Sequence, residues 1–341
     1  ALWGRALFVA AFIGLTLLAW GQGDYGRSLA EDVMVMMLFG LSLQWMMALG
    51  GLVSFGHAAF LGVGAYTQAV CTQAGMSFVP ALVCATGLSA AVGVVVGLPA
   101  LRVKGIYLGI ATLSFGFIVE EVLARWESVT GGNAGIHLKA PDLWGQSVSS
   151  AEGFYFLCLF LTVLSTLGVL NLLRSPTGRA FVAIRDSEIS AQSMGIHLAY
   201  YKTLSFAISA ALAGLGGALY GHKMQFISPD QFSVLQSIDL LLMIVVGGLG
   251  SVHGAFLGAI FLIVLPQLIS LTKDSLPDAI ALAPGLQSLV YGSVLIAFVL
   301  FEPMGMYGRW LKVRTYFQVF PFYRQGMFKR QKAFQKSDRL R

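Results

Sequence analysis

Long apolar segments alternate with short polar joints along most of the chain. The apolar segments lie near residues 4–20, 32–49, 57–74, 79–98, 105–124, 154–173, 203–222, 237–249, 254–271 and 286–302. Most of them approach the about 20 residues that an α-helix needs to cross about 30 Å of hydrocarbon. Runs such as LLLMIVVGGLG lack the strict alternation of apolar and polar positions that membrane-spanning strands require. The pattern predicts an all-α, polytopic transmembrane bundle of about ten helices, some of them short or broken.

Composition agrees with burial in a bilayer. Of the 341 residues, 57% are hydrophobic and 11% are charged, and the mean hydropathy is +0.76. A water-soluble globule of this length does not bury so much apolar surface. The first segment, 4–20, carries one basic residue, Arg5, near its start, and no small-residue cleavage pattern precedes Asp24. We therefore expect it to be a retained span and not a removed signal peptide.

The distribution of basic residues predicts the orientation. If ten spans start inside, the cytoplasmic face holds Arg5 and the regions 99–104, 174–202 and 303–341. These four parts carry one, two, four and ten of the 22 lysines and arginines, and the outer joints carry the remaining five. Cytoplasmic loops retain basic residues during membrane insertion. Both termini are therefore predicted to be cytoplasmic.

The chain is predicted to form one transmembrane permease domain, residues 1–308, followed by a basic cytoplasmic tail, residues 309–341. Its two long joints are a cytoplasmic one at 174–202 and an external one at 125–153. The tail mixes basic and aromatic residues, which also occurs at nucleic-acid surfaces. A basic segment that leaves a span at the anionic leaflet is more typical of contact with membrane lipid, so we expect no nucleic-acid partner.

Residues 174–196, RSPTGRAFVAIRDSEISAQSMGI, are unusually polar for this chain. Ser175 can cap free backbone amides, and Pro176 suits the first position of a helix. A second short helix is predicted to begin near Ser187 and to end before Gly195, because glycine often terminates helices. The segment is therefore expected to form two short helices outside the membrane.

The side chains of this segment form an apolar set and a charged set. The apolar residues are Phe181, Ile184, Ile189 and Met194, and the charged residues include Arg179, Arg185, Asp186 and Glu188. Two interpretations stay open from the residues alone. The segment is either a solvated loop whose charges keep it inside, or a docking element that enters a groove on a cytoplasmic partner.

The segment from Arg174 to Gly195 resembles the cytoplasmic coupling loop of ATP-binding-cassette import permeases. The general form of that loop has a glutamate, two alanines and a glycine six places after the glutamate. Here Ile189 and Ser190 replace the alanines, and Gly195 follows Glu188 by seven places. This departure resembles the variant found in the branched-chain amino acid permease family.

Three further motifs resemble the same family in the same order. They are KGIY at 104–107 followed by ATL at 111–113, TGGNAGI at 130–136, and GGLGS at 247–251. The resemblance covers about residues 30–302. It is greatest to the second of the family's two permease subunits, the one that pairs with a shorter homologous partner.

This resemblance implies a permease subunit in a bacterial-type inner membrane that translocates branched-chain or related hydrophobic amino acids. It implies three kinds of partner: a homologous second permease, two cytoplasmic ATPase subunits and an extracytoplasmic binding protein. ATP and Mg would be bound by the ATPase subunits, because this chain holds no G-x-x-x-x-G-K-[S/T] loop. The residues expected to couple to an ATPase are Arg179, Phe181, Ile184, Arg185, Glu188, Ile189, Ala191, Met194 and Gly195.

Two glycine-rich joints are candidate parts of the translocation path. GGLVSFGHAAFLG at 50–62 and GGLGSVHGAFLG at 247–258 are similar, with one residue deleted in the second. Spans interrupted by glycine expose polar backbone to a cavity in many transporters. The candidate path or gate residues are Ser54, His57, Phe60, Thr112, Ser114, Phe115, Gly248, Ser251 and His253. Helix packing explains these residues equally well, and a true internal duplication stays an open interpretation.

Motifs for catalysis and metal binding are absent from the sequence. There is no H-E-x-x-H, no paired-cysteine zinc pattern and no G-x-S-x-G elbow. We therefore expect no catalytic site, no metal site and no cofactor in this subunit. The alternatives left open are import of urea or short amides, an ATP-independent channel or secondary carrier, and a membrane-embedded enzyme. No predicted span has a central acid, which disfavours an ion-driven carrier.

Overall fold

A computed structural model gives the structure of the chain. It describes residues 23–319, except for 102, 104, 144–145, 148–150, 274–285 and 302–303, together with Gly14 and Thr16. Apart from those two positions, the first predicted span, 4–20, lies outside the described residues. Residues 320–341, the greater part of the predicted tail, also lie outside them.

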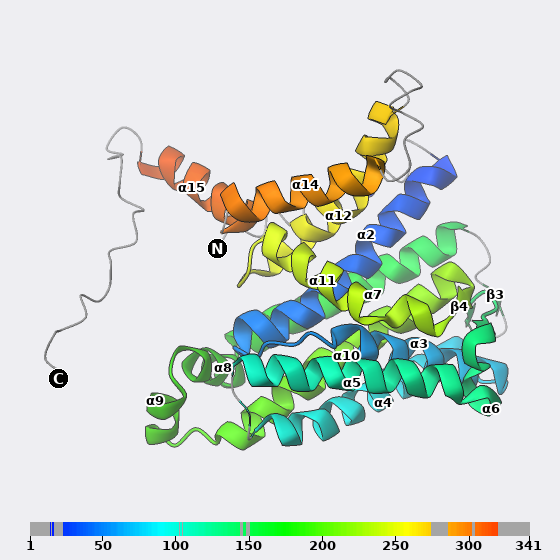
Figure 1. Cartoon of the computed structure of the whole chain (residues 1–341), viewed down its shortest axis with the longest axis horizontal. Coiled ribbons are helices and arrows are strands. Elements are labelled where there is room, and N and C mark those ends of the chain that lie inside the picture. Colours follow the sequence, from blue (N-terminus) through cyan, green and yellow to red (C-terminus); the bar gives the residue numbers. More distant parts are fainter. Residues whose placement is uncertain are drawn as a thin grey trace, which may run out of the picture.

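The described residues are predominantly α-helical, as predicted (Figure 1). The long helices are α2 (Gly23–Gln44), which continues into the π-helix η1 (Trp45–Leu49), α3 (His57–Gln73), α4 (Phe78–Ala100), α5 (Ile106–Arg125), α7 (Ala151–Arg174), α10 (Leu198–Met224), α11 (Val234–Gly247), α12 (Val252–Lys273), α14 (Leu286–Phe301) and α15 (Gly305–Val319). The short ones are α6 (Glu127–Thr130), η2 (Gly132–Ala134), α8 (Pro176–Asp186), α9 (Glu188–Ser193) and η3 (Pro229–Phe232).

Seven helices within the described residues are long and apolar enough to cross a membrane. They are Gly23–Ala48, Phe78–Ala100, Ile106–Arg125, Glu152–Arg174, Leu198–Met224, Pro229–Gly247 and Val252–Ser270. Within the described residues, the segment Leu289–Phe298 is a shorter apolar helix, and α3 has 17 residues. The all-α polytopic fold is confirmed, whereas the predicted count of about ten spans is not.

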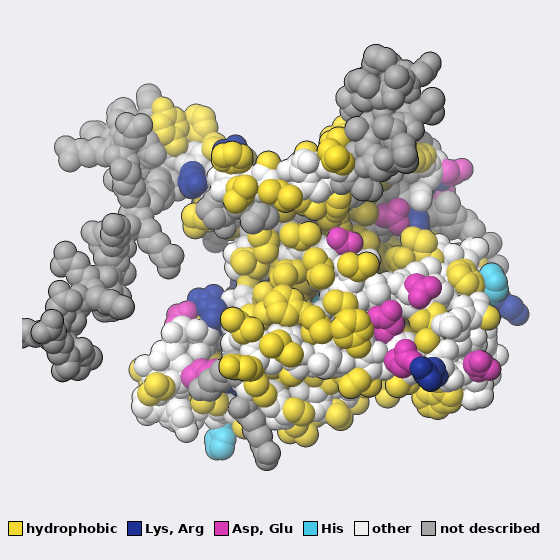
Figure 2. Space-filling model, viewed as in Figure 1, with side chains coloured by type: hydrophobic (Ala, Val, Ile, Leu, Met, Phe, Trp, Pro, Cys, Tyr) yellow, Lys and Arg dark blue, Asp and Glu magenta, His cyan; other side chains and the backbone are white. Residues whose placement is uncertain are grey.

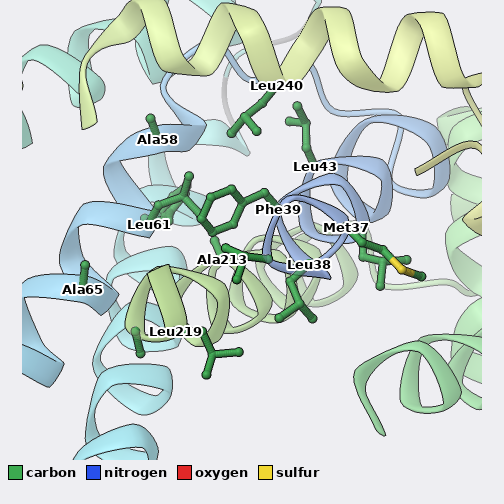
Figure 3. Packing of buried hydrophobic residues seen from close by; sticks show 14 of the residues in the cluster. Met37, Leu38, Phe39, Leu43, Ala58, Leu61, Ala65, Ala213, Leu219 and Leu240 are labelled. Carbon is green, nitrogen blue, oxygen red and sulfur yellow. The ribbon is translucent and has the colours of Figure 1, made fainter. Parts of the chain in front are cut away.

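Helix α2 lies at the centre of the bundle, and α7, α10 and α12 contact it. Most of its side chains are buried. Figure 3 shows Phe39 of α2 close to Leu61 of α3 and Ala213 of α10. In hydrocarbon the solvent is as apolar as the protein interior, so close packing replaces the hydrophobic effect as the main attraction between helices. The core therefore depends on complementary shapes around α2.

Helices α3 and α10 touch through their backbones. A Cβ atom on Gly64 would lie 2.3 Å from the Cα atom of Gly214, and one on Gly217 would lie 2.1 Å from the carbonyl oxygen of Leu61. Small residues permit such close approach in membrane bundles. A larger side chain at Gly64 would separate the two helices.

The long joints at 125–153 and 174–202 lie at opposite ends of the bundle. In Figure 1, α8 and α9 lie at the left end, and α6, β3 and β4 lie at the right end. Figure 2 shows hydrophobic side chains over the middle of the front face between these ends. The two joints are therefore separated by the length of the long apolar helices.

The described residues of the joint 125–153 and its surroundings contain two short antiparallel ladders. β1 (Ile136–His137) pairs with β4 (Phe226–Ile227), and β2 (Asp142–Leu143) pairs with β3 (Gln146–Ser147). Because β4 directly follows α10, the first ladder attaches the joint 125–153 to the end of that helix.

A buried ion pair joins α2 to the end of α10. The Lys223 ammonium lies 2.5 Å from the Glu31 carboxylate, and it also donates to Ser28 Oγ over 2.9 Å. The sequence predicted a span that starts at residue 32 and contains no acid away from its ends. The prediction was wrong here because α2 begins at Gly23, which places Glu31 within the helix. A buried charge of this kind requires a hydrogen-bonded partner, and Lys223 supplies it.

Candidate functional site

Helix α8 begins as the sequence predicts. Ser175 is its N-cap, and the Gly178 amide donates to Ser175 Oγ over 3.2 Å. Pro176 occupies the first helical position, where the missing N–H leaves no intrahelical bond unmade. These local interactions fix the direction in which the chain leaves α7.

Helix α9 is bounded by two local motifs. Ser187 ends α8 and caps α9, because its Oγ accepts a hydrogen bond from the Ser190 amide over 3.3 Å. At the other end the Ile196 amide donates to Ala191 O over 3.1 Å, and the Gly195 amide donates to Gln192 O over 3.0 Å. This pair of bonds is a Schellman motif, and Gly195 has the φ of +82° that the motif requires.

The apolar side chains of α8 pack inside this chain. Phe181 is 2% exposed and Ile184 is 3% exposed. The Phe181 ring meets Trp45 of η1 and Tyr201 of α10 edge-to-face, at centroid distances of 5.2 and 5.7 Å. Such pairs stabilise beyond the area that they bury. Phe181 and Ile184 therefore anchor α8 to the transmembrane helices, and their surfaces are not available to a partner in this structure.

Arg185 attaches the end of α8 to the end of η1. Its Nη1 donates to the carbonyl oxygen of Ala48 over 3.1 Å, and its Nη2 lies 2.9 Å from the Asp186 carboxylate. The backbone at Gly51 passes directly beside Arg185, since a Cβ on Gly51 would lie 3.2 Å from Arg185 Cγ. Arg185 thus links the segment 174–196 to the first glycine joint.

An ion pair connects α9 to α10. Lys202 Nζ lies 2.6 Å from Glu188 Oε1, and the lysine side chain is 5% exposed. Removal of one partner from a mostly buried pair leaves an uncompensated charge, which is costly. The pair therefore holds the first turn of α9 against the first turns of α10.

The outer surface of α9 is exposed. Ile189 is 82% exposed and Met194 is 80% exposed, and Arg179 on α8 is exposed as well. Ala191, which is also part of α9, is buried. The structure thus divides the nine predicted coupling residues into an anchored group (Phe181, Ile184, Arg185, Glu188, Ala191) and an outward-facing group (Arg179, Ile189, Met194), with Gly195 ending α9.

The first glycine joint, residues 50–56, follows the π-helix η1 and precedes α3. Its backbone presses against α5: a Cβ on Gly56 would lie 1.8 Å from the Thr112 carbonyl oxygen. The Phe55 amide donates to Thr112 Oγ1 over 3.1 Å. Thr112, which the sequence placed among the path residues, therefore holds the joint against α5 from a buried position.

A buried hydrogen-bond network joins the start of α3 to α2 and α10. His57 Nε2 bonds with Ser42 Oγ, and Ser42 Oγ donates to Ser209 O over 3.0 Å. Ser209 Oγ donates back to Ser42 O over 2.7 Å. His57, Ser54 and Phe60 are all fully buried inside the chain, so in this structure they contribute to packing around the joint.

The second glycine joint, residues 248–251, is attached to α2. Gln44 Nε2 donates to Gly248 O over 2.8 Å and to Ser251 O over 2.9 Å. Gly248 has a φ of +116°, a backbone conformation that side chains disfavour. Gln44 thus bonds to the second joint, and it directly precedes η1, which leads into the first joint.

Helix α15 packs on the second joint. His253 stacks on Tyr307 at a centroid distance of 5.1 Å and an interplanar angle of 9°. A Cβ on Gly305 would lie 2.6 Å from Gly248 Cα. The domain boundary predicted at residue 308 thus falls inside a helix that contacts α11 and α12.

Two of the predicted path residues lie toward the surface of α5. Ser114 is exposed and Phe115 is half-buried. The Phe115 ring lies 5.1 Å from that of Phe60, between centroids. Only Ser114 therefore presents its side chain outward, while Phe115 also packs against α3.

Three residues of this site were not identified from the sequence: Gln44, Trp45 and Lys202. Each joins the segment 174–196 or a glycine joint to another helix. A polar residue inside an apolar segment is a signal that the sequence carries for Gln44, since such residues in spans are rarely without a partner. Lys202 carried no such signal, because it lies at the edge of the polar joint 174–202. Trp45 carried no such signal. Within the described ranges, no group of three or more metal-ligating side chains is placed to hold a metal ion.

Comparison with known proteins identifies a family. A family model described as "Branched-chain amino acid transport system / permease component" matches residues 27–299. The high-affinity branched-chain amino acid transport system permease protein LivM of Salmonella typhimurium is 32% identical over 326 residues, which cover 88% of this chain and 73% of the relative. LivM of Escherichia coli is 32% identical over 331 residues, covering 89% and 75%.

A more distant relative has a name that refers to a different solute. The autoinducer 2 import system permease protein LsrC of Enterobacter sp. is 28% identical over 215 residues, covering 59% of each chain. The match of the family model over most of the chain, with the two LivM relatives, decides the assignment. The chain belongs to the family of permease components of branched-chain amino acid transport systems.

Proposed function

We propose that this chain is one of two homologous permease subunits of an ATP-driven importer, and that it carries branched-chain or related hydrophobic amino acids across a bacterial-type inner membrane. The family and the two LivM relatives support this cargo. The LsrC relative is named for autoinducer 2, which indicates that permeases of similar sequence serve different solutes. Selection of the solute is therefore assigned to an extracytoplasmic binding protein.

The other partners are two cytoplasmic ATPase subunits, which bind ATP and Mg. The end of the bundle that carries α8 and α9 faces the cytoplasm in this proposal, and the end that carries α6 faces the binding protein. The basic residues of 174–202 support that orientation. Both chain termini are then cytoplasmic.

The observation that carries the proposal is the contrast between α8 and α9. Ile189 and Met194 project from α9 with about four-fifths of their surface exposed, whereas α8 beneath them is fixed to η1 and α10. An exposed amphiphilic helix on a rigid base suits insertion into a groove on an ATPase. Loose attachment would absorb any movement of the partner, but a buried anchor transmits it.

Movement of α9 would be transmitted to the transmembrane helices through two sets of contacts. The Glu188–Lys202 pair leads to α10, which contacts α2, α3 and α4. Arg185 and Phe181 lead to η1 and so to the first glycine joint. Through Gln44 the same movement reaches the second joint. We therefore assign both glycine joints a gating role, with Ser54, His57, Phe60, Thr112, Ser114, Phe115, Gly248, Ser251 and His253 on or beside the gate.

The test removes the exposed apolar contact without touching the anchor. We expect Ile189→Ala/Met194→Ala to lower ATP-dependent leucine uptake and solute-stimulated ATPase activity by about tenfold, since loss of about 1.4 kcal/mol of contact changes an equilibrium constant by that factor. Binding of leucine by the isolated binding protein should stay unchanged.

The matched control is Ser190→Ala/Ser193→Ala, which changes two exposed polar residues of the same helix. It should retain uptake to within about twofold, as surface substitutions of this kind have small effects. Normal uptake by the Ile189→Ala/Met194→Ala variant would refute the docking role of α9. Co-purification of the ATPase subunits with wild-type protein separates an ATP-driven importer from a channel or secondary carrier.

A further inference from the structure

A pocket lies between the end of α4, the inner side of α9 and the start of α10. It has a volume of about 550 Å³, within the range of about 300–1,000 Å³ that is usual for small-ligand sites. Its polar lining comes from Glu188, Gln192, His197 and Lys202, and its apolar lining includes Leu101 and Ala199. The coupling role of α9 does not account for a cavity of this size behind it.

Lys202 is the buried charge of this pocket. Its ammonium carries three N–H donors, and among the described residues only Glu188 accepts a hydrogen bond from it. The side chain is 5% exposed, so bulk water reaches it poorly. A buried ammonium with unused donors that lines a cavity favours a ligand with strong acceptor oxygens.

An apolar groove continues from the pocket along the outside of the bundle. Its volume is about 380 Å³, and it shares Leu101 and Ala199 with the pocket. The other lining residues come from the last turns of α4 and the first turns of α10: Val94, Leu98, Tyr200, Thr203, Leu204 and Ala207. Tyr200 is exposed at its mouth, and tyrosine is typical of the level of the lipid headgroups.

We propose that this groove and pocket together bind one phospholipid that has a primary-amine, phosphatidylethanolamine-type headgroup. An acyl chain lies in the groove between α4 and α10, and the headgroup enters the pocket behind α9. The phosphate accepts hydrogen bonds from Lys202, and the headgroup ammonium lies against the carboxylate of Glu188. The leaflet that supplies this lipid, the cytoplasmic one, rests on the orientation proposed above.

The headgroup follows from the charges of the pocket. Among the described residues that line the pocket, Lys202 and Glu188 are opposite charges 2.6 Å apart, so a headgroup there meets both an ammonium and a carboxylate. An anionic headgroup without an ammonium would satisfy Lys202 but would approach Glu188 with like charge. A quaternary ammonium cannot donate a hydrogen bond to the carboxylate. A headgroup with one phosphate and one primary ammonium complements both side chains.

A bound lipid would act on coupling through α9. The headgroup would bridge Glu188, in the first turn of α9, and Lys202, near the start of α10, so it would add to the existing link between the coupling helix and the transmembrane bundle. Removal of the lipid would leave α9 attached by the Glu188–Lys202 pair and by its connection to α8. We therefore expect lipid occupancy to increase the response of the permease to its ATPases.

The test uses the intact transporter complex, purified through this chain from membranes and analysed by native mass spectrometry. Ala199→Trp fills the junction of groove and pocket without removing either charge. Val83→Trp is the matched control, because Val83 is an exposed residue of α4 outside the groove. We expect wild-type and Val83→Trp complexes to retain phosphatidylethanolamine through mild delipidation, and Ala199→Trp to retain at least about tenfold less.

A second arm tests the headgroup. Delipidated wild-type complex is returned to nanodiscs of phosphatidylcholine with one-fifth of either phosphatidylethanolamine or phosphatidylglycerol. Phosphatidylethanolamine should restore solute-stimulated ATPase activity and should be retained on re-extraction, whereas phosphatidylglycerol should do neither. Equal retention of the two lipids, or equal retention by wild type and Ala199→Trp, would overturn the proposal.

Two outcomes separate this inference from the proposed function. Loss of the second permease subunit from the Ala199→Trp complex would show that the groove is a protein interface, and it would overturn the lipid site while leaving the importer assignment intact. Retained phosphatidylethanolamine in a complex that fails to transport leucine would support the lipid site and would count against the cargo.

Discussion

The backbone conformation of Gly195 ends α9 within the segment 174–196. It adopts a φ of +82° and closes the Schellman motif that ends α9. No atom lies within 4 Å of the position of a Cβ there, so a side chain would meet a torsional penalty and no steric clash. Glycine is therefore favoured at position 195 by the backbone conformation and not by lack of space.

The torsional penalty at Gly195 can be measured by substitution. Gly195→Ala should destabilise α9 by about 1–2 kcal/mol, the cost of a left-handed conformation for a residue with a Cβ. Amide hydrogen exchange within 188–196 should then be about 5- to 30-fold faster. Gly195→Asn should show a smaller increase, because asparagine tolerates this conformation better. An alanine variant that exchanges at the wild-type rate would contradict the conformational role.

Local residue patterns predicted the ends of α8 and α9 correctly. Ser175, Pro176, Ser187 and Gly195 act within three or four residues of themselves, so the sequence contains all the information needed. The direction in which Phe181 points could not be predicted in this way. Its partners, Trp45 and Tyr201, come from other helices, and its apolar character suits a partner's groove as well as this chain's interior.

At the scale of elements, α8 packs against the rest of the chain, whereas α9 carries the exposed apolar side chains Ile189 and Met194. Phe181→Ala should destabilise the protein by about 3–5 kcal/mol, because it empties a packed site between η1 and α10. Ile189→Ala, which changes an exposed side chain of α9, should change stability by less than about 0.5 kcal/mol. Thermal unfolding of the two variants in nanodiscs measures the difference. Similar midpoints for both would show that α8 is not anchored as described.

Gln44, at the end of α2, attaches the second glycine joint to the helix that leads through η1 into the first joint. Gln44→Ala removes two hydrogen bonds and leaves the carbonyls of Gly248 and Ser251 without this donor, which costs about 1–3 kcal/mol. Amide exchange across 248–255 should therefore accelerate by about tenfold or more.

Gln73→Ala is the control for this prediction, because the Gln73 amide makes a long, exposed bond of 3.5 Å to His137 O. Its effect on exchange across 248–255 should be negligible. If both glutamine variants behave alike, the two joints are not coupled through Gln44. The sequence indicated that the joints resemble each other, but the attachment of the second joint to α2 through Gln44 depends on packing between distant segments.

At the scale of the whole molecule, the two ends of the bundle should be accessible from opposite sides of the membrane. Val129 on α6 and Ser193 on α9 are both exposed and lie in joints at opposite ends. In a background with Cys71, Cys84 and Cys158 replaced by alanine, a membrane-impermeant maleimide should label Val129→Cys in spheroplasts and not Ser193→Cys.

Inside-out vesicles should give the reverse pattern of labelling. Labelling of Ser193→Cys from the outside would invert the proposed orientation and would remove α9 from the reach of any cytoplasmic ATPase. Labelling of both positions from the same side would contradict the arrangement of the bundle itself, whichever way it is inserted.

The sequence by itself determined the membrane class, the helical architecture, the approximate limits of the helices and the caps of the coupling segment. These features depend on local periodicity, on the thickness of a bilayer and on contacts between near neighbours in the chain. It also carried the motifs that indicated the family. The predicted count of about ten spans is not confirmed: seven helices of the described residues are long enough to span a membrane, whereas α3 and the segment Leu289–Phe298 are shorter.

Tertiary structure alone decided which apolar residues are anchors and which are exposed, and which buried charges find partners. Phe181 and Ile189 are equally apolar in the sequence, yet one is enclosed by η1 and α10 and the other projects from α9. Glu31 with Lys223, and Glu188 with Lys202, pair between different helices. The physical reason is the same in each case: burial and pairing are properties of two surfaces brought together, and a single segment specifies only one of them.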